Sequence, residues 1–322
     1  MIDIDPSKTV DRDAEKTEFG RMLRFADDRR LLVIGDAKGT GKSTLLRLLR
    51  YDCRWVHNVP VSLVLLEPDP DTHDDRLPIE SPIEFVQWAR EDLAVSDLAF
   101  PVYDFLNDLR LQFLWPPIAH SLTSVEDYLN EHFRAQGISL RGEASATSVS
   151  GGSVAGVYIK ELRLEPQKAW ARRDLERISS QRCVEAFFHD LRRACATRSV
   201  VILIDSYERR HPGLQEWLLE SFIRPMCLGQ TRPQRLLVVL AGCESELPPF
   251  QQMLHADFDR LVASRRLLGW TEQHVRDFLG VHKYGHLGEG DFQIVFGKVR
   301  EGWSIRAALS LAEVLARGAV AS

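Results

Sequence analysis

The sequence is short of several features that would place it in a common class. Its 322 residues include five cysteines, which are scattered and form no C-x-x-C pair, so we expect neither a disulfide framework nor a zinc site. No apolar run approaches the roughly 20 residues that a membrane helix needs. The first six residues lack the basic and apolar regions of a signal peptide. We therefore expect reduced thiols and a cytoplasmic protein with no membrane partner.

An excess of basic residues is also missing. The net charge is -5 at pH 7, whereas domains dedicated to binding nucleic acid are usually basic. Nucleic acid is therefore not expected as a partner. Hydrophobic residues make up 44% of the chain and charged residues 27%, which are ordinary values for a globular protein, and the length suggests about two domains.

Alternating strand and helix patterns predict the fold class. Apolar runs predict the five strands of a parallel sheet at residues 31–34, 61–66, 200–204, 236–240 and 266–268. Helical patterns separate these runs at residues 44–51, 184–196, 214–223 and 272–279. This alternation predicts an α/β fold, a three-layer sandwich with helices on both faces of a five-stranded parallel sheet.

The gap between the second and third predicted strands is too long for one crossover, so we expect a mostly helical insertion at about residues 80–175. Helical patterns lie at residues 81–93, 101–114, 124–134 and 167–178, the first of them opened by Ser81 and Pro82. Residues 142–156 are rich in serine and glycine and predict a flexible loop. Two further helical patterns within residues 291–316 indicate a C-terminal helical subdomain. We expect a main domain over residues 1–270 and this subdomain over residues 271–322.

One stretch, LVIGDAKGTGKSTLL over residues 32–46, carries most of the chemistry. An apolar strand leads into a glycine-rich turn, and Gly41-Lys42-Ser43 opens an amphipathic helix. Backbone N–H groups of such a turn at a helix N-terminus form an anion site. We expect the following residues to bind nucleotide phosphates: Gly39, Thr40, Gly41, Lys42, Ser43 and Thr44. Lys42 would reach the β- and γ-phosphates and act in catalysis, and the Ser43 hydroxyl would ligate Mg²⁺.

The turn departs from the usual spacing at its start. Asp36 stands five residues before Gly41, where the motif has a glycine, and Gly35 lies one position too early. The loop therefore has either a substituted first glycine or one extra residue.

A second signal is the apolar run at residues 199–204 that ends in Asp205. A carboxylate at that position holds the water shell of Mg²⁺ opposite the Ser43 hydroxyl. The next residue, Ser206, lacks the carboxylate that usually polarises the attacking water. Glu208 is the nearest candidate for this catalytic role, and the alternative is that it is an exposed acid at the start of the next helix.

Together these residues resemble the STAND class of P-loop NTPases, relatives of the NACHT and NB-ARC switch ATPases. Residues 10–15 resemble the Gly-Arg-x-x-Glu element of the class, with Asp11 in place of glycine, and the resemblance implies that Arg12 lies against the nucleotide base. Residues 205–208 resemble its Walker B region. Residues 235–242 resemble the strand that, in many such ATPases, lies between the strand before the phosphate-binding loop and the strand that ends in the Walker B aspartate. Residues 267–271 resemble a following strand.

The same resemblance shows two departures. Cys243 stands where the family has an arginine, and Gly302-Trp303-Ser304 stands where it has Gly-x-Pro. In that family both positions take part in sensing the nucleotide, so the resemblance implies nucleotide binding more than nucleotide sensing.

The resemblance implies that residues 1–270 are a P-loop NTPase domain and that the chain is a molecular switch. It would bind ATP and ADP with Mg²⁺, hydrolyse ATP slowly, and act in bacterial signalling or defence through a protein partner or effector module, forming a homo-oligomer on activation. No guanine-type Asn-Lys-x-Asp motif is present, which favours adenine.

Two other functions stay open. An AAA-type ATPase that remodels protein or nucleic acid would need an arginine finger, for which Arg265 or Arg266 is placed. The third reading is a nucleotide-binding scaffold that does not hydrolyse its ligand.

Overall fold

The computed structural model describes residues 12–36, 40–67, 78–114, 172–209, 212–230, 232–267, 270–301 and 305–320. The chain divides into two compact units, one made of residues 1–98 and 192–322 and the other of residues 99–191. The predicted helix at 124–134 and the predicted loop at 142–156 lie outside the described residues.

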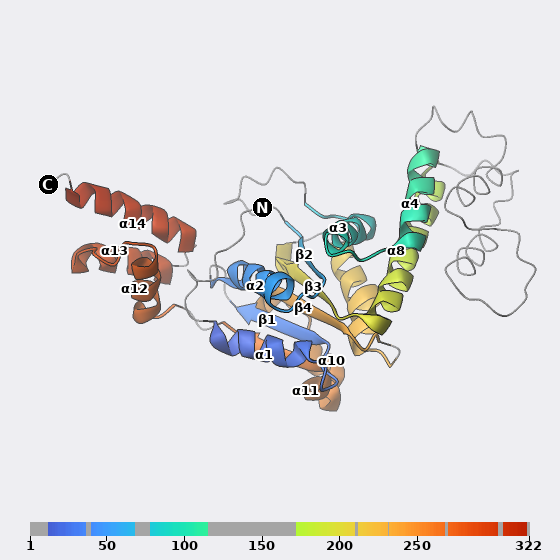
Figure 1. The fold of residues 1–322 in the computed structure, drawn as a ribbon, viewed down its shortest axis with the longest axis horizontal. Helices are drawn as coiled ribbons and strands as arrows, with labels where there is room; N and C mark the ends of the chain where they lie inside the picture. Colours follow the sequence, from blue (N-terminus) through green and yellow to red (C-terminus); the bar gives the residue numbers. More distant parts are fainter. Residues whose placement is uncertain are drawn as a thin grey trace, which may run out of the picture. The chain divides into compact units, whose positions relative to one another are not determined.

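In its described part, the first unit is built on a five-stranded parallel sheet (Figure 1). Its strands are β1 (Leu31–Asp36), β2 (Val61–Leu65), β3 (Val200–Asp205), β4 (Leu236–Cys243) and β5 (Val262–Arg266). They lie in the order β2-β3-β4-β1-β5, with Leu31 opposite both Val238 and Val262. Because neighbouring strands run in the same direction, their carboxyl ends share one edge, where open α/β sheets bind ligands.

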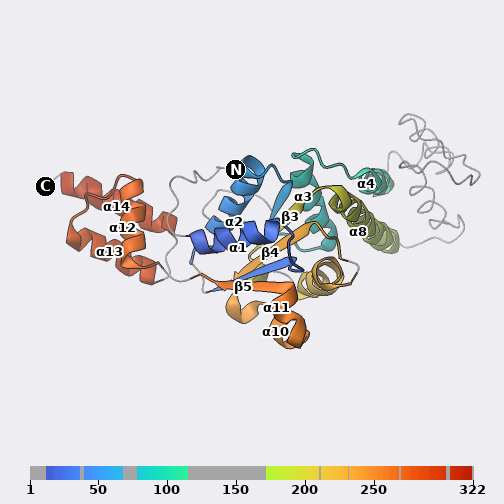
Figure 2. The same cartoon turned by 60° about the horizontal axis from the view of Figure 1, so that its bottom comes forward.

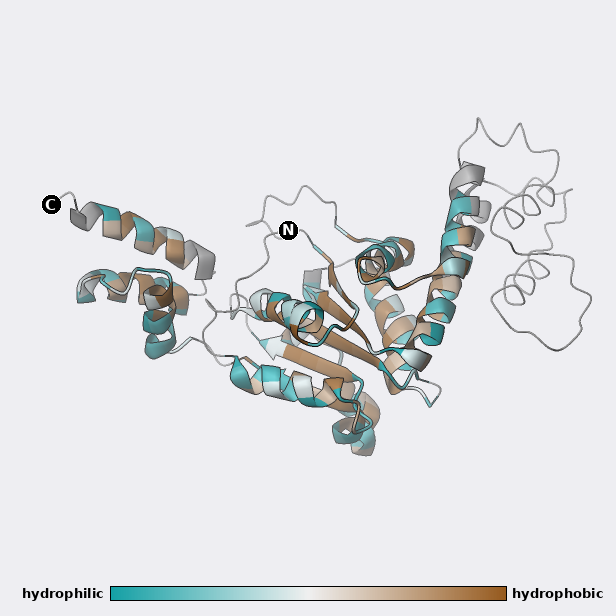
Figure 3. Cartoon of the chain, in the orientation of Figure 1, coloured by the Kyte–Doolittle hydropathy of each residue, from teal (hydrophilic) through white to brown (hydrophobic). Residues whose placement is uncertain are grey.

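Both faces of this sheet are buried. On one face the alternate residues of the strands pack against α1 (Asp13–Leu23) and α2 (Lys42–Tyr51), which lie beside the sheet in Figure 2. The π-helical segment η5 (Leu218–Leu228) also packs on β4 and β1. Its buried side chains do not belong to the cluster formed by α1, α2 and the strands. Every residue of β3 is buried, and Figure 3 shows the strands coloured mainly as hydrophobic. The α/β class and the parallel sheet are thus as predicted.

Four predicted strands are confirmed, and the prediction of the fifth at residues 266–268 is wrong. The strand is β5, which ends at Arg266. It lies at the edge of the sheet, where only Val262 and Ala263 are buried and the next three residues are exposed. It therefore has no continuous apolar run. The resemblance of residues 267–271 to a strand is wrong for the same region, since Thr271 is the N-cap of α12 (Glu272–Val281).

The predicted helices that lie in the described part begin and end close to their expected positions, with two differences, whereas α1 was not predicted. Residues 172–197 form one helix, α8 (Arg172–Thr197), where two shorter helices were expected. The helix expected at residues 214–223 is split into α9 (Pro212–Trp217) and the wider η5, which contains Pro225. Ser81 caps α3 (Pro82–Ala94) as predicted, in a reciprocal capping box with Glu84.

The remaining short elements of the first unit connect the strands. They are η2 (Asp52–Val56), η4 (Tyr207–Arg209), η6 (Glu244–Glu246), α10 (Phe250–Leu254), η7 (His255–Asp257) and α11 (Phe258–Leu261).

Three helices form a separate apolar core at the C-terminal end of the chain. They are α12, α13 (Glu289–Arg300) and α14 (Ile305–Val320), and they share the buried residues Val275, Leu279, Phe292, Val295, Ala308 and Ala312. Helices were predicted here, while the domain boundary at residues 270/271 stays a prediction. Within the described residues, no helix is both long and apolar enough to cross a membrane.

The second unit contains α4 (Pro101–Leu114) and most of α8. Asp190 of α8 accepts hydrogen bonds from the backbone N–H groups of Val102 and Tyr103, at 2.9 and 3.0 Å. Phe100 stacks on Phe187 with ring centroids 5.1 Å apart. One carboxylate and one aromatic pair therefore hold the start of α4 against α8.

Candidate functional site

The candidate site begins at Gly41, the residue before α2. Gly41 has φ +90°, a left-handed conformation that glycine adopts without strain, and a Cβ there would lie 3.4 Å from Arg12 Nη2. The first N–H groups of α2 have no partners within the helix. The predicted residues Lys42, Ser43 and Thr44 form that first turn, whereas Gly39 lies outside the described residues.

Lys42 folds back toward the strand that precedes it. Its Nζ donates to the carbonyl oxygen of Asp36, the last residue of β1, at 3.0 Å, and the side chain is buried. The ammonium group is thus held over the turn between β1 and α2. A phosphate group at this turn would offer Lys42 a charged acceptor in place of a carbonyl.

Arg12 contacts the residue before Gly41. Its Nη2 donates to the carbonyl oxygen of Thr40 at 2.8 Å, and its guanidinium group lies 5.8 Å from the centroid of the Trp270 ring. The structure therefore brings Arg12, Thr40 and Gly41 together, while the expected place of Arg12 against a nucleotide base stays a prediction.

Ser43 and Asp205 meet at the carboxyl edge of the sheet. The Ser43 side chain hydrogen-bonds the Asp205 carboxylate, which also accepts from the Ser206 N–H at 2.8 Å. Burial raises the pKa of Asp205, and the positive charge of Arg47 on α2 counteracts that rise. Ser206 has φ +60°, so the chain turns away directly after the strand.

Glu208 is half-buried in the first turn of η4. Its Oε2 accepts a hydrogen bond from the backbone N–H of Cys243, at the end of β4, at 3.0 Å. Gly242 makes this approach possible, because a Cβ there would lie 3.1 Å from Glu208 Oε2 and 3.2 Å from Tyr207 Cβ. Glu208 thus joins the ends of β3 and β4, a contact that the sequence alone does not reveal.

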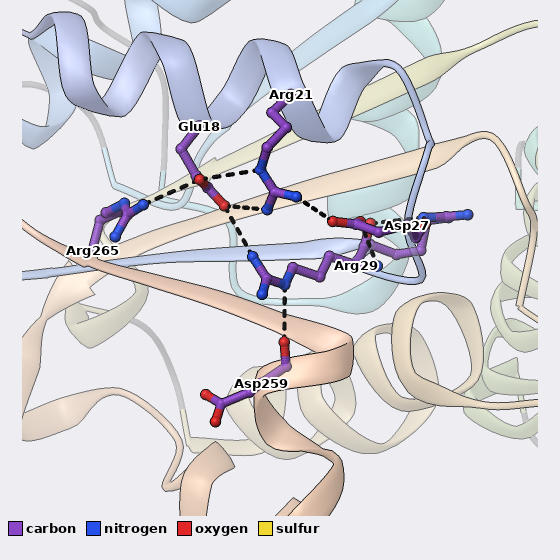
Figure 4. Close-up of polar contacts among 7 residues, drawn as sticks. Glu18, Arg21, Asp27, Arg29, Asp259 and Arg265 are labelled. Atoms are coloured by element: carbon purple, nitrogen blue, oxygen red, sulfur yellow. Dashed lines mark hydrogen bonds and ion pairs between the residues drawn. The ribbon is translucent and has the colours of Figure 1, made fainter.

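Both arginine-finger candidates are engaged in ion pairs. Arg265 Nη2 lies 3.1 Å from Glu18 Oε2, and Arg266 Nε donates to Glu244 Oε1 at 2.7 Å. Figure 4 shows Glu18 of α1 among three arginines, the others being Arg21 and Arg29. The hydrogen bond from Arg21, together with the charges of Arg265 and Arg29, holds the pKa of Glu18 below its usual value.

The described residues contain no cluster of three or more histidine, cysteine, aspartate or glutamate side chains that could hold a metal ion. The Ser43 hydroxyl and the Asp205 carboxylate are a pair of neighbouring oxygen groups that could serve as ligands. Mg²⁺ is usually bound by one or two protein groups together with water and substrate phosphates, so this pair suits it.

Trp270 was missed as a site residue. It lies between β5 and α12, and its indole nitrogen is near the position that a Cβ of Gly41 would take, at 3.7 Å. The sequence signal is Thr271-x-x-His274, a capping box that marks the start of a helix. A helix that starts after Thr271 leaves Trp270 in the connection before the helix and not in a strand.

No protein-family model matches the chain, and a search of curated proteins finds no match.

Proposed function

We propose that this chain binds ATP and ADP with Mg²⁺ at the carboxyl edge of its sheet and acts as a nucleotide-dependent switch, in the manner of STAND-class P-loop NTPases. The observation that carries the proposal is the hydrogen bond between Ser43, at the start of α2, and Asp205, at the end of β3. It brings the two predicted magnesium ligands together from segments far apart in the sequence.

The turn before α2 fits a phosphate group. Gly41 has a left-handed conformation at the start of α2, a helix N-terminus favours an anion, and Lys42 and Arg12 add two positive charges. Donors therefore surround the turn from the helix and from two side chains. A polyphosphate is the ligand class that such a set of donors matches.

The Asp205 carboxylate fits a divalent cation. Burial disfavours its charged form, and a cation beside it would favour that form. When bound, Mg²⁺ would neutralise part of the phosphate charge. Ser43 and Asp205 would hold the ion, and Lys42 would hold the phosphates.

The contacts of Glu208 support slow rather than fast hydrolysis. A general base must reach the attacking water, and here the Glu208 carboxylate is bound to the Cys243 N–H. Hydrolysis would require Glu208 to leave this N–H. The ion pairs of Arg265 and Arg266 also favour a switch over an AAA-type motor that needs a free arginine. Action through a protein partner or effector, with oligomerisation on activation, completes the proposal.

The proposal is tested by nucleotide binding. Mass spectrometry of the purified protein should detect retained ADP, and calorimetry should show ADP binding in the presence of Mg²⁺. Lys42→Ala should weaken ADP binding about 10- to 100-fold, because it removes a charged donor to phosphate. Lys298→Ala, which removes the same charge from α13, is the matched control and should bind as the wild type does.

Two results would overturn the proposal. One is a folded wild-type protein that binds neither ATP nor ADP, and the other is a Lys42→Ala variant that binds ADP unchanged. ATP turnover by the same preparations should be slow and insensitive to added DNA. Brisk turnover stimulated by DNA would favour the AAA-type function instead.

A further inference from the structure

Trp270 is held in place by the start of α12. It directly precedes Thr271, whose side chain accepts from the His274 N–H at 3.2 Å while His274 Nδ1 accepts from the Thr271 N–H at 3.3 Å. The Trp270 ring packs edge-on against Phe278 of α12, with centroids 5.3 Å apart, and joins the apolar core of the C-terminal helices. Its position therefore depends on the first turns of α12.

The polar atom of the same side chain faces the turn before α2. Trp270 Nε1 is buried, and none of the described residues accepts a hydrogen bond from it. It lies 3.7 Å from the position of a Cβ on Gly41, and the Arg12 guanidinium lies over its ring. A buried N–H without an acceptor is unfavourable and rare in folded proteins.

The chemistry of this N–H indicates what would satisfy it. An indole nitrogen only donates, so its partner must be an acceptor. The Arg12 guanidinium beside it is a donor as well, and the Thr40 carbonyl oxygen already accepts a hydrogen bond from Arg12 Nη2. An oxygen of an anionic ligand would supply the acceptor that the indole N–H does not find among the described residues.

We propose that Trp270 is a nucleotide-binding residue whose indole N–H donates to a phosphate oxygen of the nucleotide held at Gly41. This inference rests on the proposed function and adds how binding is transmitted. Because the Trp270 ring belongs to the core of α12–α14, a nucleotide that fixes the indole also stabilises the start of α12. Trp270 thus links occupancy of the site to the C-terminal helices.

Trp270→Phe tests the contact, since it removes the N–H and keeps an aromatic ring for the helical core. We expect calorimetry to show ADP binding weakened about 10-fold, the effect of one hydrogen bond to a charged group. The matched control is Trp55→Phe, because Trp55 is 67% exposed on η2, and this variant should bind ADP as the wild type does. Circular dichroism checks that both variants are folded.

The outcomes separate this inference from the function on which it rests. If the wild type binds no ADP, both fail; if it binds ADP and Trp270→Phe binds equally well, the Trp270 contact alone is wrong. Hydrogen exchange on the wild-type protein gives a second test that needs no variant. ADP should slow amide exchange in α12, and unchanged exchange there would overturn the link to the C-terminal helices.

Discussion

Two buried aspartates, one in each unit, show how similar burial can have different uses. Burial raises the pKa of both Asp190 and Asp205, but their partners differ. Asp190 accepts from two backbone N–H groups at the start of α4, which would otherwise lack partners. Asp205 is bonded by the Ser43 hydroxyl, which can also ligate a metal ion. The first carboxylate holds two helices together, and the second is the one that we propose to bind a ligand.

We expect the largest difference between the two aspartates in nucleotide binding. Asp205→Ala removes a proposed Mg²⁺ ligand and should lower ADP affinity in Mg²⁺ about 100-fold. Asp190→Ala, the matched variant in the other unit, should stay close to wild type. Calorimetry with Mg²⁺ and with EDTA measures both, and an Asp205→Ala protein that still responds to EDTA as the wild type does would contradict the assignment.

For the free energy of unfolding we expect the opposite order, with Asp190→Ala having the larger effect. Asp190→Ala leaves the N–H groups of Val102 and Tyr103 without an acceptor and should lower the free energy of unfolding by about 1–3 kcal/mol. Asp205→Ala should leave that free energy unchanged or raise it, because a desolvated carboxylate is lost. Urea unfolding compares the variants, with Asp190→Asn as a control that keeps an acceptor oxygen. Greater destabilisation by Asp205→Ala would reverse the comparison.

The smallest expected effect is a pH dependence that the two aspartates share. The native pKa of each aspartate lies above its unfolded value near 3.8. Between these two values the native state therefore binds more protons than the unfolded state does. Stability should therefore fall as pH rises through this window, and the loss is complete above the native pKa. Urea unfolding across the window should show a weaker decline in Asp205→Asn than in the wild type. An equal decline in the variant would mean that Asp205 does not contribute.

The central strands could be predicted from sequence because a strand buried on both faces is a continuous apolar run. β3 and β4 are such strands, and both were located correctly. β5 pairs with a single neighbour, β1, and exposes Arg265 and Arg266, so its pattern does not differ from that of a loop. Position in the sheet, which the sequence does not state, decides which strands can be recognised.

The candidate site shows the same limit. Ser43 and Asp205 were paired in advance because each belongs to a motif whose spacing is local. The contact of Glu208 with Cys243 depends on β4 lying next to β3, and the placement of Trp270 beside Gly41 depends on where α12 begins. Contacts of this kind join segments far apart along the chain, so no local pattern reveals them.

The strand order also bears on how the protein is made. β1 is synthesised long before both of its neighbours, β4 and β5, which come from residues 236–266. Until the ribosome has released that segment, the apolar run of β1 has no partner strand on either side. Pairings this distant form slowly and leave hydrophobic strands open to aggregation. A nascent chain of this topology has reason to depend on a chaperone until β5 emerges.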